Sequence, residues 1–167
     1  MAITVEDGTI VTGAESYCTV AFADEYHAKR GNAAWDLLDA VDQKEPALRK
    51  ATDYLEQAFF SLWKGIRVED DQALSWPRRY AYIDDYTLID DNIVPEAVKR
   101  ACAELALKAS AAELAPDMTQ GVVSETVGPI SVTYDAGSPQ RKRYRAIENM
   151  LAPYLKAGGG AMVRIDR

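Results

Sequence analysis

Apolar residues recur at intervals of three and four along two long stretches, which is the spacing of one helical face. The first predicts a helix that opens at a capping box of Asp42 and Glu45 and ends near Trp63, with one buried face of Leu48, Ala51, Leu55, Ala58, Phe59 and Leu62. The second predicts a helix from Pro95 to about Leu114, whose buried side is Val98, Ala101, Cys102, Leu105 and Ala109.

Shorter helices are predicted on either side of these two. Thr19 is a suitable N-cap for a helix through Arg30, and Gly31 suits the left-handed stop that follows. Asn32 is placed to cap the next turn. Near the C-terminus, Ser138-Pro139 predicts the start of a third long helix that Pro153 kinks or ends, with an apolar stripe of Tyr144, Ile147, Leu151 and Tyr154.

Between the second and third long helices the pattern changes to strict alternation. Residues 122–134 alternate apolar and polar positions on both sides of Gly128-Pro129, which predicts a two-stranded hairpin. The fold class is therefore mainly α: a bundle of three longer and one or two short helices, a protruding β-hairpin and a C-terminal tail. We expect one domain over residues 1–156 and a tail over 157–167, joined by Gly158-Gly159-Gly160.

Charge is unevenly distributed along the 167 residues. The net charge is -7, but residues 1–120 hold 12 Lys and Arg against 22 Asp and Glu, whereas residues 121–167 hold 7 against 4. Affinity for nucleic acid without sequence preference comes mainly from cations that replace counterions on phosphates, so an acidic body predicts weak DNA binding. An acidic surface would suit the lining of a channel through which DNA slides without binding. No signal peptide is expected, and no apolar run approaches the roughly 20 residues that span a bilayer.

Catalytic chemistry has few candidates in this sequence. His27 is the only histidine, and Cys18 and Cys102 lack the close pair spacing of zinc sites. A Cys18–His27 nucleophile pair is conceivable, but a partly exposed helical histidine and two reduced structural thiols are the expectation. No phosphate-binding glycine motif occurs. We therefore expect no enzyme, no metal and no cofactor, although a hydrolase with an unrecognised site stays open.

Two charged clusters are candidates for contacts with a partner. Asp84-Asp85 and Asp90-Asp91 could be solvated loop charges, could hold a divalent cation, or could line a lumen or meet basic groups on a neighbouring subunit. The basic cluster of Arg141, Lys142, Arg143 and Arg145 is expected in the first turns of its helix, where cations are mildly unfavourable. Solvated charge, an acidic patch on another copy, and nucleic acid are its three interpretations.

The segment Gln72 to Leu107 joins a Trp-Pro-Arg turn, an acidic loop with several tyrosines, and an Ala-rich helix. Arg78 and Arg79 beside Trp76 and Tyr80 could stack on bases and contact phosphates. We favour the other interpretation, in which Trp76 anchors the loop on the core. Together with VEDGT, GAESYCTVAFADEYHAKRGNAAW and VGPISVTY, this segment resembles small phage and prophage head-tail connectors. Some relatives of this kind are described as DnaT-like single-stranded-DNA-binding proteins.

The resemblance implies a structural role in the virion of a tailed bacteriophage. Such adaptors form a ring of about twelve copies that docks on the portal and continues the DNA channel. The implied partners are other copies, the portal and a tail terminator or other neck protein, with no membrane, and assembly takes place in the host cytoplasm. The alternative is a DnaT-like replication accessory protein that binds single-stranded DNA through Arg78, Arg79 and the basic cluster. The residues expected to bind partners are Val127, Ile130, Val132, Arg141, Lys142, Arg143, Arg145, Met162, Val163, Arg164 and Ile165.

Overall fold

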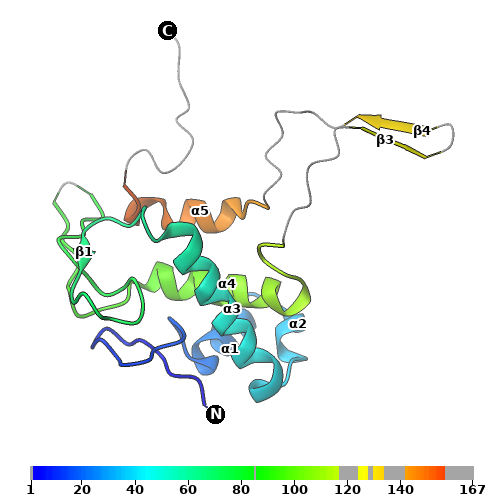
Figure 1. The fold of residues 1–167 in the computed structure, drawn as a ribbon. Helices are drawn as coiled ribbons and strands as arrows, with labels where there is room; N and C mark the ends of the chain where they lie inside the picture. Colours follow the sequence, from blue (N-terminus) through cyan, green and yellow to red (C-terminus); the bar gives the residue numbers. More distant parts are fainter. Residues whose placement is uncertain (1, 85, 117–123, 128–129, 134–141, 157–167) are drawn as a thin grey trace, which may run out of the picture.

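Helices form the body of the molecule in a computed structural model that describes residues 2–84, 86–116, 124–127, 130–133 and 142–156 (Figure 1). The α-helices are α1 (Val20–Ala28), α2 (Ala33–Asp36), α3 (Glu45–Phe59), α4 (Glu96–Ala111) and α5 (Arg145–Leu151). The strands are β1 (Ile66–Arg67), β2 (Arg78–Arg79), β3 (Ser124–Val127) and β4 (Ile130–Thr133). The predicted fold class, mainly α with a small hairpin, is confirmed.

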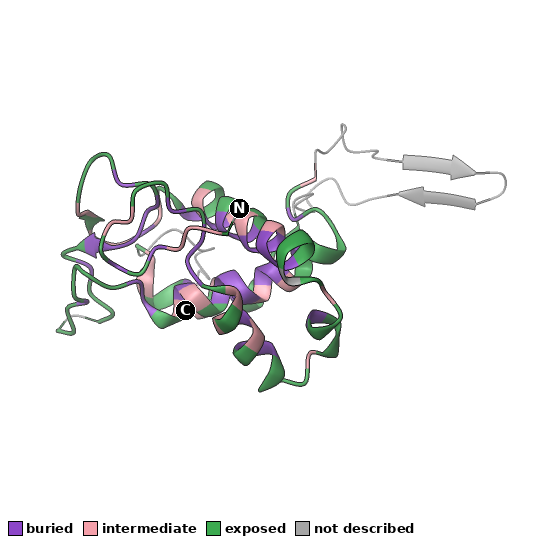
Figure 2. Ribbon diagram, turned by 90° about the horizontal axis from the view of Figure 1, so that it is seen from below, coloured by how far each residue is buried: buried purple, intermediate pink, exposed green. Residues whose placement is uncertain are grey.

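The two longest helices, α3 and α4, pack against each other at the centre of the body. Every residue of the predicted α4 face is buried, and so are Leu48, Ala51, Leu55 and Phe59 of α3, while Ala58 is exposed. Figure 2 shows this buried stripe along the facing helices. Ala103 and Ala106 are buried as well, because α1 and α5 also pack on α4. The small side chains of α4 therefore admit three neighbouring helices.

The start and stop of α1 follow the sequence signals. The Thr19 hydroxyl accepts a hydrogen bond from the Phe22 amide at 3.0 Å, and Gly31 adopts the left-handed conformation at φ 67°. Asn32 occupies the cap position of α2, but its side chain makes no capping bond. It donates instead to Nδ1 of His27 at 3.0 Å, a contact that a local capping rule does not predict.

The predicted capping box at the start of α3 is wrong. A π-helical turn, Ala40–Lys44, runs directly into α3, so Asp42 and Glu45 do not mark the helix start. The capping carboxylate belongs to Asp39, which accepts from the amides of Val41 at 2.9 Å and Asp42 at 3.0 Å. The chain thus begins to coil one turn before the predicted position.

The last helix is shorter than predicted. Residues 142–144 are not helical, α5 begins at Arg145, and Ala152–Tyr154 close it as a 3-10 turn that contains Pro153. The described cations Lys142 and Arg143 therefore precede the helix and do not lie in its first turns, where they would oppose the positive end of the helix dipole. Ser138-Pro139 and Arg141 lie outside the described residues.

The predicted hairpin is present as β3 and β4, which pair antiparallel with Val127 opposite Ile130 and Glu125 opposite Val132. This register puts positions 127, 130 and 132 on one face of the ladder, because faces alternate along a strand. Only the backbone of these strands is described. The tail residues Met162, Val163, Arg164 and Ile165 lie outside the described part.

Candidate interaction surface

Residues 60–94 connect α3 to α4 and form the loops at the β1 end of the body in Figure 1. Their only strands, β1 and β2, are two residues long and pair Ile66 with Arg79. The side chain of Gln72 supports the turn between them. Its Oε1 accepts from the amides of Val68 at 2.8 Å and Glu69 at 3.0 Å, and its Nε2 donates to the carbonyls of Leu74 at 2.7 Å and Pro77 at 3.1 Å.

Arg78 holds the same loops from inside. Its buried guanidinium donates to the carbonyl oxygens of Lys64 at 2.7 Å, Ser75 at 3.1 Å and Gly65 at 2.9 Å. Burial lowers the pKa of Arg78 from its usual value, but three carbonyl partners suit the charged form. The predicted use of Arg78 as a DNA-contacting residue is therefore wrong, since its buried guanidinium is already bonded to three carbonyl oxygens of the chain.

Trp76 is buried in the core, as favoured from the sequence. Its ring packs edge-on against Trp63 and Tyr154, with ring centroids 5.7 and 6.1 Å away. The turn before it is tied to α3 by Glu56, whose Oε2 accepts from the amide of Ser75 at 3.1 Å and from its hydroxyl at 2.7 Å. Trp76 consequently offers no face to a base.

Several apolar side chains of the following loop are exposed. We call four of them the tyrosine surface: Tyr80, Tyr82, Tyr86 and Leu88. The loop folds back on itself. The Ile89 amide donates to the Ala81 carbonyl at 2.8 Å, and the Ile83 amide donates to the Thr87 carbonyl at 3.0 Å. Tyr82 lies opposite Leu88 in an antiparallel bridge. Ala81 and Ile89 are buried beneath, so the loop is anchored on one side and presents tyrosines on the other.

Asp84 fixes the tip of this loop. Its carboxylate accepts from the amides of Tyr86 at 2.9 Å and Thr87 at 2.6 Å, and these bonds lower the pKa of Asp84. The Asp91 carboxylate forms an ion pair with the Arg79 guanidinium at 3.3 Å. Asp90 is exposed, while Asp85 lies outside the described residues. Two of the four predicted lumen or intersubunit carboxylates therefore already have partners within the chain.

The described part of the basic cluster lies at the start of α5. Arg143 makes a two-point ion pair with Glu148, at 3.1 and 2.8 Å, which raises the pKa of Arg143. Lys142 is exposed, and its ammonium donates to the carbonyl of Glu113 at 3.4 Å. Arg145 is exposed too. Because Glu148 neutralises Arg143, the start of α5 carries less positive charge than the basic residues in the sequence indicate.

His27 is fully buried, so the predicted partial exposure is wrong. Its Nε2 donates to the carbonyl of Ala103 at 3.0 Å while Nδ1 accepts from Asn32, and burial lowers the pKa of His27. Both nitrogens have partners other than Cys18, which removes the Cys18–His27 pair. Cys18 and Cys102 are free, buried thiols, as predicted.

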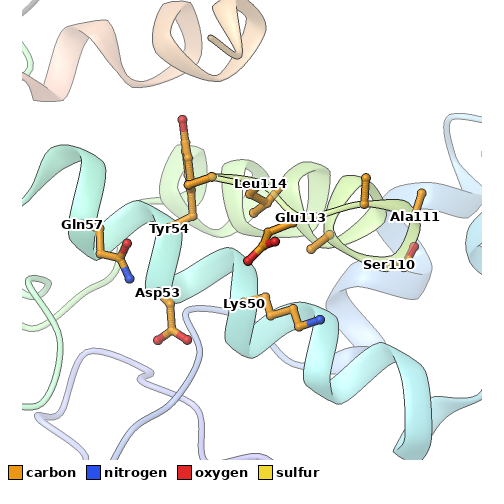
Figure 3. A pocket seen from close by; sticks show the side chains of 11 residues that line it. Lys50, Asp53, Tyr54, Gln57, Ser110, Ala111, Glu113 and Leu114 are labelled. Atoms are coloured by element: carbon orange, nitrogen blue, oxygen red, sulfur yellow. The ribbon is translucent and has the colours of Figure 1, made fainter. Parts of the chain in front are cut away.

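A hollow with a volume of about 510 Å³ lies between α3 and the end of α4 (Figure 3). Lys50, Asp53, Tyr54 and Gln57 line one side, and residues 109–115 line the other. This set lacks a nucleophile with an adjacent base. Among the described residues no group of His, Cys, Asp and Glu could hold a metal ion. In the same residues no helix has the length and apolar character needed to cross a membrane.

The tyrosine surface was not among the residues predicted to bind a partner. A usable signal was present, because three tyrosines and four aspartates occur in the loop between two buried anchors, Trp76 and Val94. Of these tyrosines only Tyr80 was considered for contact with bases, since the exposure of the others depends on which loop residues reach the core.

A protein-family model described as "Putative DnaT-like ssDNA binding protein" matches residues 1–167, the whole chain. The chain belongs to this family. No curated protein and no solved structure matches it. The resemblance to DnaT-like proteins is thus confirmed, whereas none of these matches is to a head-tail connector.

Proposed function

We propose that this member of the DnaT-like family acts by binding and not by catalysis, as a structural head-tail connector of a tailed bacteriophage. In this role copies form a ring on the portal, DNA passes through without specific binding, and the partners are other copies, the portal and a further neck protein. The protein would be assembled in the host cytoplasm and reside at the head-tail interface of the virion.

One observation carries this proposal: the described surface has an excess of carboxylates, and many of its cations are already paired. Fifteen acidic side chains are exposed against ten basic ones. Lys29, Arg79, Arg100 and Arg143 each have a carboxylate partner within the chain. Like charge repels the phosphate backbone over about 8 Å at physiological salt, which suits a wall that DNA must pass.

The second candidate is single-stranded DNA binding, and it has two supports. The family description names this activity. The tyrosine surface also presents three exposed rings in the loop that follows Arg79, and base stacking on aromatic rings is worth roughly 1–3 kcal/mol per base. Single-strand binders combine such rings with a positive groove, whereas here Arg79 is paired with Asp91 and the neighbouring carboxylates repel phosphate.

Two measurements separate these candidates. Electron microscopy of the purified protein, alone and with its candidate portal, tests for a ring. Fluorescence anisotropy with a labelled oligonucleotide tests for DNA binding, and we expect weak or no binding at physiological salt. Submicromolar binding that is lost on Arg141→Glu with Arg143→Glu, or on Tyr82→Ala with Tyr86→Ala, would establish the second candidate instead.

The hairpin provides a matched pair of variants for the ring assay. Val127→Asp with Val132→Asp places charge on the face of the ladder that carries positions 127, 130 and 132, and we expect it to block ring formation while the helical content persists. Thr126→Asp with Ser131→Asp adds the same charge at a pair on the opposite face. If both doubles assemble with the portal like the wild type, the hairpin is not an assembly element.

A further inference from the structure

The tyrosine surface is preformed and has no covering element among the described residues. Tyr86 is 92% exposed, Tyr80 68% and Leu88 52%, although the Asp84 turn and the buried Ala81 and Ile89 hold the loop in place. A loop whose backbone is already held in one conformation loses less entropy when it binds. The same loop carries two exposed carboxylates, Asp84 and Asp90, which we call the acidic rim. The surface therefore suits a segment with apolar and basic side chains.

The C-terminal end of the described chain lies beside this loop. Leu155 pairs with Trp63 in an antiparallel bridge, and the Lys156 amide donates to the carbonyl of Leu62 at 2.8 Å. The ammonium of Lys64 then joins the two regions directly. It donates to the carbonyl of Pro153 at 2.8 Å and to that of Ile83, within the tyrosine loop, at 3.4 Å.

Residues 157–167 follow Lys156 in the sequence. An extended segment of this length reaches at most about 36 Å. The Lys64 side chain alone joins Pro153 to the tyrosine loop, so the segment is long enough to reach the tyrosine surface. It contains Gly158-Gly159-Gly160, and glycine is the residue type with the fewest steric restrictions on its backbone. Beyond the glycines stand three apolar residues, Met162, Val163 and Ile165, interspersed with Arg164 and Arg167. This is the chemistry that the tyrosine surface with its acidic rim would recognise.

We propose that the tyrosine surface is the docking site of the chain's own residues 161–167, with Val163 and Ile165 against Tyr82 and Leu88 and the arginines at the acidic rim. A short linker gives the attached segment a millimolar effective concentration, so weak contacts suffice for partial occupancy in the same molecule. Any external partner of the tyrosine surface must then displace the tail. This docking does not depend on the function proposed above.

Tyrosine acetylation by N-acetylimidazole, followed by peptide mass spectrometry of the full chain, tests the docking. Val163→Asp with Ile165→Asp should release the tail and raise the acetylation rates of Tyr82 and Tyr86 by roughly twofold or more, as expected for partial occupancy. Ala157→Asp with Gly158→Asp adds the same charge outside the docked segment and should keep the wild-type rates. Tyr54, which packs on Tyr144 away from the loop, serves as the internal reference.

Two results would overturn the proposal. Equal rates in the wild type and in both double variants would mean that the tail does not cover the tyrosines. Protection that increases over about a hundredfold range of protein concentration would identify a second copy as the occupant, because docking within one molecule is independent of concentration.

Discussion

The α3–α4 pair and the 60–94 loops are held in place by different forces. Between the helices, leucine, alanine and cysteine side chains are removed from water along the whole contact. In the loops, individual polar side chains such as Gln72, Arg78 and Asp84 satisfy backbone groups one by one. Apolar burial is shared among many residues, whereas each of these polar side chains has a task that no neighbour duplicates.

The contrast shows how one small chain can combine a stable body with a recognition surface. Burial of apolar area makes the helices cooperative, since each side chain contacts several others. Side-chain hydrogen bonds and short backbone pairings within the loops satisfy their polar groups, so the tyrosines need not pack on the core and can face solvent. Four variants test this difference, and they are ordered below by the size of the expected effect.

Leu105→Ala should cause the largest loss. Leu105 is fully buried on α4, and deletion of a buried leucine costs about 2–5 kcal/mol through lost transfer energy and an unfilled cavity. Urea denaturation of wild type and variant gives the difference in the free energy of unfolding. Leu37→Ala is the control, because Leu37 is 86% exposed and its truncation should change little. Equal losses in the two variants would mean that the helix contact is not the main source of stability.

Arg78→Met should cost on the order of 2–3 kcal/mol, because three buried carbonyl oxygens lose their donor while the bulk of the side chain is kept. The effect should be local. In the Arg78→Met variant, hydrogen exchange should accelerate more for amides of the 60–94 loops than for amides of α4. The neighbouring Arg79→Met removes only an exposed ion pair and should cost less than about 1 kcal/mol. A uniform acceleration across α4 and the loops would contradict the separation of the two regions.

The same division explains how much could be predicted from the sequence. The α4 face was predicted residue by residue, since helical contacts repeat with a fixed period. The hairpin was predicted from alternation and its turn. Neither Arg78 nor Gln72 carries such a signal, because their partners are backbone carbonyls that become close only after the loops fold.

The start of α5 and the position of His27 were missed for related reasons. A basic run after a Ser-Pro pair indicated the first turns of a helix, but the ion pair of Arg143 with Glu148 holds it just before the helix. His27 was expected to be a partly exposed helical histidine. Its two ring nitrogens are satisfied by Ala103 and Asn32, and neither partner is evident from the spacing within α1.

His27 should make stability depend on pH in a defined window. Burial lowers the pKa of His27 in the folded protein, so as pH falls His27 takes up a proton in the unfolded chain before it does so in the folded protein. The stabilisation is fully present above the unfolded pKa of about 6.5 and is lost progressively as pH falls below it. Urea midpoints at decreasing pH, kept above the range where carboxylates titrate, should show this loss. His27→Gln should have lower stability and a flatter profile, and an unchanged slope would assign the pH dependence to other groups.

Tyr86→Ala should have the smallest effect on stability, within about 0.5 kcal/mol, although it removes a large aromatic side chain. Tyr86 is 92% exposed, and the bonds that shape the loop tip run from its backbone amide to Asp84, so they survive the substitution. Gln72→Ala is the contrasting variant in the same region. Gln72 is buried and makes four hydrogen bonds to the backbone, and we expect its loss to cost about 1–3 kcal/mol. Urea denaturation of both variants measures the difference. A large loss for Tyr86→Ala would show that the tyrosine packs on the body and is not reserved for a bound segment.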